Sequence, residues 1–286
     1  MTAVAGAERL AGAGDRRVRP GAALAWTFLA LVAVAALWPS LLAGHQPNAV
    51  DPAHALAGPG SGHPFGTDQL GRDILSRIVY GTRASVTIGL GATAFAVVAG
   101  SVLSTLAALG GRAADELVMR TTDVFLAFPG LLLAMLVVAV LGGSTLNATL
   151  AIGMSSAPGF ARLIRGQMLV IRESDYVQAA RALGRRPLDI HLRHTLPNAL
   201  PPVLVLATVQ VGAAIIGGSS LSFLGLGPKP PTAEWGAMLA EGRSFLAADW
   251  AVAVFPGLVL TATVVACNVA GRSLRRRFEG RRHVDL

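Results

Sequence analysis

Charge is the first property that this sequence has little of. Only 14% of its 286 residues are Asp, Glu, Lys or Arg, and 53% are hydrophobic, whereas soluble domains carry about 25% charge. About 20 helical residues cross the hydrocarbon core of a bilayer. The composition therefore predicts a polytopic membrane protein and argues against a soluble enzyme or a disordered chain. Five stretches of more than twenty residues lack all four charged types: 20–50, 84–111, 124–161, 194–228 and 250–271.

Cysteine and lysine are also scarce. The single cysteine, Cys267, lies in the last apolar run, so the chain can form neither an internal disulfide nor a CxxC metal site. The single lysine, Lys229, stands in the sequence Gly-Pro-Lys-Pro, so no phosphate loop of the GxxxxGK[ST] form can be built. We therefore expect no catalytic residue, ATP site or cofactor in this chain.

The apolar runs predict an all-α fold of six transmembrane helices. The run 124–161 is too long for one helix, and Gly142-Gly143-Ser144 supplies a turn within it. The first run has the outline of a signal peptide or an anchor, and Leu41, where a cleavage site needs a small residue, favours an uncleaved anchor. The helices are expected at 21–43, 83–108, 117–141, 146–164, 199–221 and 250–271.

Basic residues are distributed unevenly around these helices. With the N-terminus inside, 19 of the 24 Lys and Arg residues fall on cytoplasmic segments, which is the bias expected for an even number of spans with both termini in the cytoplasm. The net charge of +8 thus indicates orientation against anionic lipid and not nucleic-acid binding. The predicted parts are a basic tail 1–20, a first span 21–43, an external segment 44–82, a five-helix core 83–271 and a basic tail 272–286.

The longest predicted cytoplasmic segment, 162–198, contains the string SDYVQAARALGRRPLDIHLRHTLPNALP. It predicts two short helices around a turn. Ser174 fits an N-cap, Gly184 the left-handed end of the first helix, Pro187 the start of the second and Pro197 its end. By physics alone, the segment could be a basic connector at lipid headgroups or a docking surface.

Several residues of this segment resemble a known motif. Gln178-Ala179-Ala180, Gly184 and Leu196-Pro197 have the spacing of the EAA loop in the membrane subunits of ABC importers, and YVQAARALG with RHTLPNALPP resembles the dipeptide, oligopeptide and nickel branch. In that family the loop, here 175–197, docks on a cytoplasmic ATPase. The resemblance implies a coupling role for Tyr176, Gln178, Ala179, Ala180, Ala182, Gly184, Arg185, Leu196 and Pro197.

Other segments resemble the second permease subunit of such importers. They are 66–85, 115–134, 158–167, 220–244 and 255–257, and together they cover about seven-tenths of the chain in consistent order. The sequence departs from the family at Gln178, where glutamate is usual, and at Gly218, where an acidic residue is frequent. These departures leave open the strength of coupling and the preference for substrate charge.

The resemblance implies a type I ABC importer permease in a bacterial cytoplasmic (inner) membrane. Its expected partners are a homologous second permease subunit, two ATPase subunits that bind ATP and Mg²⁺, an external substrate-binding protein and the lipid membrane. The substrate stays open among dipeptides, oligopeptides, nickel and other small solutes, and no substrate-binding residue is assigned. Two other classes remain as alternatives, an ion-coupled secondary transporter and a non-transporting membrane scaffold.

The external segments carry two further predictions. In 66–85, Leu70, Ile74 and other apolar residues share one helical face, whereas Asp73 and Arg77 lie on a polar face, as in an amphipathic helix at a membrane surface. This helix could be an elbow for the second span, or a gate or receptor contact. In the later external loop, Trp235 is expected to be an aromatic anchor at the interface.

Ionisable residues within the spans are almost absent, which argues against a secondary transporter. Asp123 is the nearest candidate, and Arg120 offers it a local partner. The histidines are expected to bind no metal. His191 and His194 could share a helix face but have no third ligand nearby, and the external His45, His54 and His63 are expected to be solvated loop residues.

Overall fold

The computed structural model describes residues 20–282. Within this range all regular secondary structure is helical, apart from one isolated bridge between Thr67 and Asp73, which confirms the predicted all-α class. Residues 1–19 and 283–286, which include nearly all of the first predicted basic tail and the end of the second, lie outside the described residues. The α-helices are α2 (Pro20–Leu37), α3 (Ile74–Leu109), α4 (Gly111–Leu126), α5 (Gly130–Leu141), α6 (Thr145–Arg172), α7 (Asp175–Ala182), α8 (Pro187–Ile190), α9 (Leu196–Phe223), α10 (Trp235–Gly242) and α11 (Ala251–Arg282).

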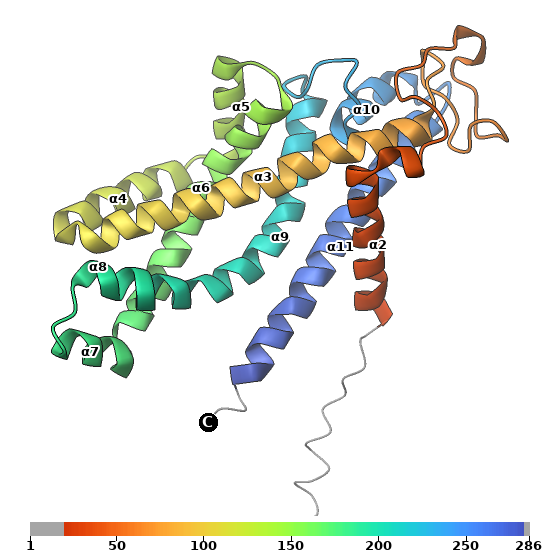
Figure 1. Ribbon diagram of the computed structural model, residues 1–286. Coiled ribbons are helices and arrows are strands. Elements are labelled where there is room, and N and C mark those ends of the chain that lie inside the picture. The colour runs from red at the N-terminus through yellow and green to blue at the C-terminus, as the bar shows by residue number, and fades with distance from the viewer. Residues whose placement is uncertain (1–19, 283–286) are drawn as a thin grey trace, which may run out of the picture.

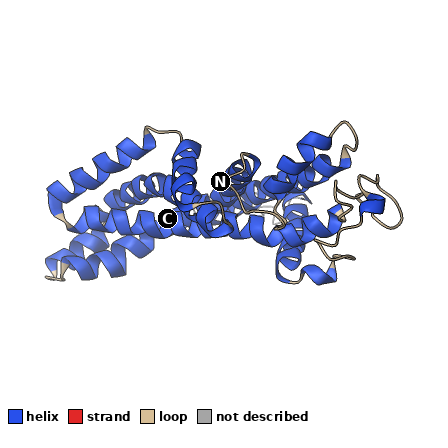
Figure 2. Ribbon diagram, turned by 90° about the horizontal axis from the view of Figure 1, so that it is seen from above, coloured by secondary structure: helices blue, strands red, loops and turns tan. Residues whose placement is uncertain are grey.

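Helix α3 is the longest helix among the described residues and lies at the centre of the fold. It packs along α6 and α9, while α2 lies beside α11 (Figure 1). Its 36 residues correspond to a length of about 54 Å, which exceeds the hydrocarbon thickness of about 30 Å. Viewed from above, the bundle is elongated along α3 (Figure 2). Helix α3 therefore extends beyond a single membrane crossing and connects the two ends of the molecule.

Small residues bring α3 and α6 into close contact. A Cβ atom at Gly100 would lie 2.8 Å from the backbone nitrogen of Ala161, so only glycine fits between the two helices at this point. One turn further along α3, Ser104 Oγ donates a hydrogen bond to the carbonyl oxygen of Ala161 at 2.8 Å. Small residues and interhelical hydrogen bonds of this kind hold helices together in a bilayer.

Four helices of the described residues are long and apolar enough to cross a membrane, and they become five if α4 and α5 form one bent span. The four are 20–37, 74–109, 187–223 and 251–275. Helix α6 has the length of a span but lies outside this group, because its sequence is more polar; it packs against α3, α5 and α9. The predicted count of six spans is therefore not confirmed in detail.

The span predicted at 117–141 is not one continuous helix, although α4 and α5 together can form one bent span. Helix α4 ends at Leu126, α5 begins at Gly130, and their axes differ by 93°. Pro129 at the break has no backbone N–H and disfavours a helical conformation at Phe128. The proline thus separates two short helices that composition alone had joined.

The expected amphipathic surface helix also differs from the structure. Residues 66–73 form a loop, and the helix begins at Ile74, with Asp73 as its N-cap, and continues without a break into α3. Arg77, placed on the exposed polar face by the sequence pattern, is 1% exposed. The segment is therefore the buried first part of α3.

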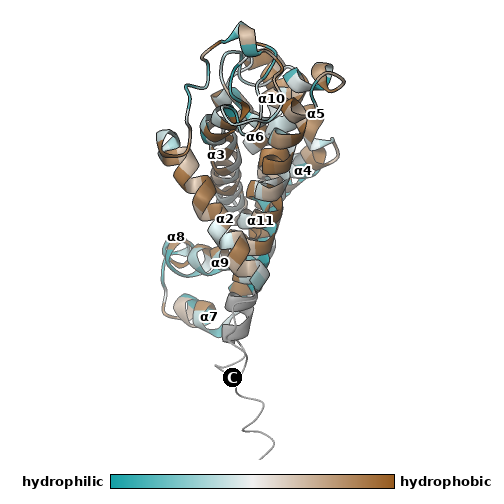
Figure 3. Ribbon diagram, turned by 90° about the vertical axis from the view of Figure 1, so that its right-hand side faces the viewer, coloured by the Kyte–Doolittle hydropathy of each residue, from teal (hydrophilic) through white to brown (hydrophobic). Residues whose placement is uncertain are grey.

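Hydrophilic residues gather at the two ends of the molecule, and much of the helical middle is hydrophobic (Figure 3). One end carries α7 and α8. The other carries α10 and the loops that precede α3, and we call it the cap end, defined by residues 38–77 and 228–249. These two ends hold the polar groups from which a site can be built.

Candidate functional site

Helices α7 and α8 form a hairpin around Gly184. Gly184 has φ of +71°, its amide donates to the carbonyl of Arg181 at 2.9 Å, and the amide of Arg185 donates to that of Ala180 at 3.2 Å. This pair of bonds is the Schellman arrangement that ends helices at a left-handed glycine. Pro187 then opens α8, where its missing N–H costs no hydrogen bond. The structure therefore contains the predicted turn, with Gly184 ending the first helix and Pro187 starting the second.

The hairpin has a small apolar core of its own. Val177, Ala180 and Ile190 are buried together and pack against Ile171 of α6. Ala180, to which the family resemblance gives a coupling role, therefore faces the hairpin interior and is not exposed to a partner. Of the other predicted coupling residues, Leu196 is half-buried, and the exposed ones are Tyr176, Gln178, Ala179, Ala182, Gly184, Arg185 and Pro197.

Two exposed leucines beside the turn were missed from the sequence. Leu183 is 80% exposed and Leu188 is 52% exposed, and with Tyr176 they place large apolar side chains on the outer surface of a basic hairpin. Large apolar side chains exposed beside a basic turn are candidates for contact with a partner. The sequence did contain a signal for them, because Leu183 stands directly before Gly184 and Leu188 directly after Pro187.

The prediction that Pro197 ends the second helix is wrong. Residues 191–195 form a π-helical turn in which the amide of Leu196 donates to the carbonyl of His191, and α9 continues from Leu196 to Phe223. A proline normally clashes with the carbonyl four residues earlier. The wider π turn changes the hydrogen-bonding pattern at that point, so the chain passes from α8 to α9 without a break.

The hairpin is connected to the bundle through three helices. Ile171 of α6 packs against the hairpin core and also against the larger core of α3, α6 and α9. At the π turn, His191 Nε2 lies 3.1 Å from Thr105 Oγ1 of α3. His194, predicted to share a face with His191, lies instead beside the ring of Tyr176. A displacement of the hairpin would thus move the ends of α3, α6 and α9 together.

The cap end holds a buried cluster of charges. Arg72 and Arg77 are 4% and 1% exposed, and both contact Asp68 and Glu241. Arg72 Nε lies 2.6 Å from Asp68 Oδ2, and Arg77 Nη2 lies 3.5 Å from Glu241 Oε2. Buried charges of this kind persist only when they are paired. Since Glu241 belongs to α10, the cluster binds α10 to the start of α3.

Glu234 and Trp235 strengthen the same junction. Glu234 is fully buried at the N-terminus of α10, where its carboxylate accepts from the amides of Gly236 and Ala237 at 2.9 Å and from Ser85 Oγ at 3.0 Å. Trp235 is also fully buried, and its Nε1 donates to the carbonyl of Ile78 at 3.1 Å. The expectation of an aromatic anchor at the membrane interface is therefore wrong, because this indole packs inside the protein.

The local pair predicted between Arg120 and Asp123 is also wrong. Arg120 Nη2 lies 2.9 Å from Glu116 on the same helix, and Asp123 pairs with Arg162 of α6. A second bond between the same two helices joins Arg165 Nε to Asp115 at 2.8 Å. These pairs attach α4 to α6.

Comparison with known proteins places this architecture among transport proteins. Residues 96–284 match the family model described as "Binding-protein-dependent transport system inner membrane component". The chain is 42% identical over 234 residues to a protein named probable D,D-dipeptide transport system permease protein of Escherichia coli K12, covering 82% of this chain and 78% of the relative. It is 41% identical over 255 residues to a glutathione transport system permease protein of Pectobacterium atrosepticum, covering 89% and 85%.

A third relative is also named as a transport permease, and two solved transporter structures share the fold. A dipeptide transport system permease protein of Alkalihalophilus pseudofirmus is 42% identical over 241 residues, covering 84% of this chain and 79% of the relative. The MetNI methionine ABC transporter contains a chain of similar fold, with a TM-score of 0.58, 19% identity and coverage of 71% and 96%. A chain of an amino acid ABC transporter gives a TM-score of 0.55, 14% identity and coverage of 70% and 94%.

Proposed function

Because the chain belongs to the family of inner membrane components of binding-protein-dependent transport systems, we propose that it is one of two homologous permease subunits of an ATP-driven importer. The second permease subunit would complete the pathway with it. An external binding protein would deliver the substrate, and two ATPase subunits would bind ATP and Mg²⁺. The chain itself is a transport subunit, and its sequence contains no phosphate loop.

The α7–α8 hairpin is the surface proposed to receive an ATPase subunit. The observation that carries this assignment is the exposed apolar side chain of Leu183 beside the Gly184 turn, together with Tyr176 and Leu188. Covering these groups would remove apolar surface from water, which favours association. The contacts of Ile171 and His191 would transmit the movement of the docked ATPase to α3, α6 and α9.

The proposed substrates are short peptides. Three relatives above 40% identity carry names that refer to dipeptide, D,D-dipeptide or glutathione transport, and all three compounds are small and peptide-like. Uptake of labelled dipeptide and of labelled glutathione by cells that produce the complete importer would separate these candidates. Uptake of neither compound, while a nickel salt is accumulated, would contradict the peptide assignment.

The proposed location is the bacterial cytoplasmic membrane, with the hairpin and both termini on the cytoplasmic side. The excess of arginine around the hairpin and in the terminal segments supports this orientation. An Arg186→Cys reporter in a Cys267→Ala background should react with an impermeant maleimide only in inverted vesicles. Labelling of intact cells at this position would overturn the orientation.

The docking assignment is tested by Leu183→Asp. Because Leu183 is 80% exposed, the substitution leaves the fold intact but puts a charge where an apolar contact is proposed. The few interface residues whose truncation costs more than about 1 kcal/mol cluster near the centre of an interface. If Leu183 is one of them, the added charge should lower the apparent affinity for the ATPase by roughly tenfold. The measurement is the amount of ATPase that copurifies with the tagged permease as salt is increased.

Leu246→Asp is the matched control. Leu246 is 48% exposed but lies at the cap end, away from the hairpin. This variant should retain its ATPase. Equal retention of ATPase by the Leu183 and Leu246 variants would refute docking at the hairpin.

A further inference from the structure

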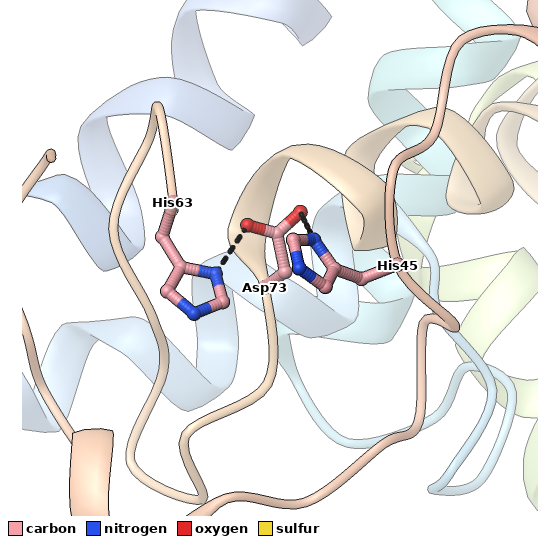
Figure 4. Close-up of side chains that lie close together, drawn as sticks. All are labelled: His45, His63 and Asp73. Carbon is pink, nitrogen blue, oxygen red and sulfur yellow. Dashed lines mark hydrogen bonds and ion pairs between the residues drawn. The ribbon is translucent and has the colours of Figure 1, made fainter. Parts of the chain in front are cut away.

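Three polar side chains of the cap end converge at the start of α3. They are His45 from the loop after α2, His63 from the loop before α3, and Asp73, the N-cap of α3 (Figure 4). One potential ligand atom from each lies within 4.8 Å of the other two. Among residues 20–282 this is the one group of three or more His, Cys, Asp or Glu side chains with such spacing. Histidines that looked like separate loop residues in the sequence are thus brought together by the fold.

The carboxylate of Asp73 is held rigidly at the centre of the group. Asp73 is 3% exposed, and its Oδ2 accepts from the amide of Ser76 at 2.8 Å. Burial acts to raise the pKa of Asp73, but hydrogen bonds from Ser76 and His63 and the nearby charge of His45 bring it below its ordinary value. The carboxylate is therefore ionised and points between the two imidazole rings.

The two imidazoles approach this carboxylate from different segments. His63 Nδ1 lies 2.9 Å from Asp73 Oδ1, and His45 Nδ1 lies 3.9 Å from Asp73 Oδ2. The ring centroids of His45 and His63 are 4.9 Å apart. The backbone of His45 is attached to α3, because its amide donates to Ser76 Oγ at 3.1 Å. An ordinary helix cap needs only the contact with Ser76, so neither imidazole is required for capping.

This donor set matches a transition-metal ion. Two imidazole nitrogens and one carboxylate oxygen suit zinc and similar first-row ions, whereas calcium and magnesium prefer sites made of oxygen atoms alone. Metal–ligand distances of about 2.0 Å in a tetrahedron place neighbouring ligand atoms about 3.3 Å apart. The distances of 2.9 Å from His63 and 3.9 Å from His45 reach different oxygens of Asp73, and the three potential ligand atoms lie within 4.8 Å of one another. A movement of the two imidazoles toward one carboxylate oxygen would bring the ligand atoms to the tetrahedral spacing.

We propose that His45, His63 and Asp73 form a binding site for one divalent transition-metal ion of the zinc class, distinct from the ATPase-docking hairpin. The side chain of His45 is 48% exposed, so water can occupy the fourth position. The amide of Ser76 orients the carboxylate from behind, as an outer hydrogen bond does in protein metal sites. The bound ion joins the loops that contain residues 45 and 63 to the start of α3.

The chain provides its own control in His54. This histidine belongs to the same external segment, but its Nδ1 lies 2.8 Å from Asp51 Oδ2, and both side chains are more than half exposed. The hydrogen bond from His54 holds the pKa of Asp51 below its ordinary value. His54 therefore has a local partner and is not a member of the three-residue group.

The test is a titration of the purified, chelator-treated importer complex with Zn²⁺ alone, in competition with a chromogenic zinc chelator. Because other subunits can bind zinc, the measured quantity is the difference between complexes that contain the parent permease or a variant. His45→Ala and His63→Ala should each remove one equivalent of zinc or weaken its binding roughly tenfold or more. His54→Ala should bind as much zinc as the parent does.

A third variant separates the metal site from the helix cap. Asp73→Asn keeps a side-chain oxygen that can accept from Ser76, since asparagine is a good N-cap, but it removes the negative charge of the ligand. It should fold and copurify with its ATPase while losing zinc affinity. Zinc binding that is unchanged in the His45 and His63 variants, or lost in only one of them, would overturn the proposal. The docking experiment on Leu183 is independent of this result.

Discussion

The two ends of this protein handle polar and charged groups in opposite ways. At the cap end, charges are buried and satisfied inside the chain, as Arg77 is by Asp68 and Glu241. At the hairpin end, charges face solvent and apolar side chains such as Leu183 are exposed. Both ends expose some apolar side chains, since Leu246 of the cap end is 48% exposed, so the contrast lies in the charges. Buried ion pairs make the cap end a rigid support, whereas the solvent-facing charges of the hairpin remain available to a partner. We therefore expect the cap end to stabilise the fold and the hairpin end to couple the protein to its partner.

The difference also appears in how each end is attached to α3. Helix α10 joins α3 through the buried charges, through Glu234 and Ser85, and through the indole of Trp235. The hairpin has a core of only a few residues, and its polar bond to α3 is that between His191 and Thr105. We therefore expect substitutions at the cap end to lower the stability of the whole protein, and substitutions in the hairpin to change coupling first.

The largest effect is expected from Arg77→Ala. This change leaves the buried Asp68 and the partly exposed Glu241 with one arginine in place of two, and breaking a buried ion pair costs about 3–5 kcal/mol. The midpoint of thermal unfolding in detergent should fall markedly. Arg120→Ala, which breaks an exposed pair with Glu116, should hardly change it. Equal shifts in the two variants would contradict the contrast between buried and exposed charges.

A smaller loss of stability is expected from Glu234→Ala. The change removes the carboxylate that caps α10 and leaves two amides and Ser85 without their acceptor. Loss of such a cap and of its buried partners should lower the free energy of unfolding by about 2 kcal/mol. Glu234→Gln keeps an acceptor oxygen and should recover part of this loss. The measurement is again unfolding in detergent, with copurification of the ATPase as a check that the hairpin remains functional.

The smallest effect on stability is expected from Gly184→Ala. No atom lies within 4 Å of the position that a Cβ would occupy, so the only cost is the left-handed backbone, about 1 kcal/mol. The strain is local to the turn. We therefore expect a clear decrease in the rate of substrate-stimulated ATP hydrolysis and only a small decrease in the midpoint of thermal unfolding. Gly184→Asn should be milder, because asparagine tolerates this conformation better. A large loss of global stability with normal coupling would reverse the roles assigned to the two ends.

Local chemistry explains which features the sequence could predict. The turn at Gly184 and the helix start at Pro187 depend on neighbouring residues, and both are present. The predicted all-α membrane class followed from long apolar runs, and the family resemblance followed from motifs in consistent order. Each of these features is a property of a continuous stretch of chain.

The features that were missed depend on contacts between distant residues. Arg77 looked like part of a solvated helix face because its partner Glu241 is supplied by α10, much later in the chain. Asp123 was assigned a local partner, but Arg162 of α6 reaches it instead. Ala180 faces inward because Ile190 lies on the other arm of the hairpin. The break at Pro129 had a local signal, but long apolar runs on both sides of it concealed the two short helices.

The central claim is that the hairpin, and not the cap end, contacts the ATPase. The most direct measurement is site-specific crosslinking in the assembled importer, with Leu183→Cys or Leu246→Cys carrying a short photo-reactive crosslinker in a Cys267→Ala background. Both leucines are exposed and lie at opposite ends of the molecule. We predict that the ATPase is captured from position 183 and not from position 246. Capture from position 246, with none from position 183, would contradict the account.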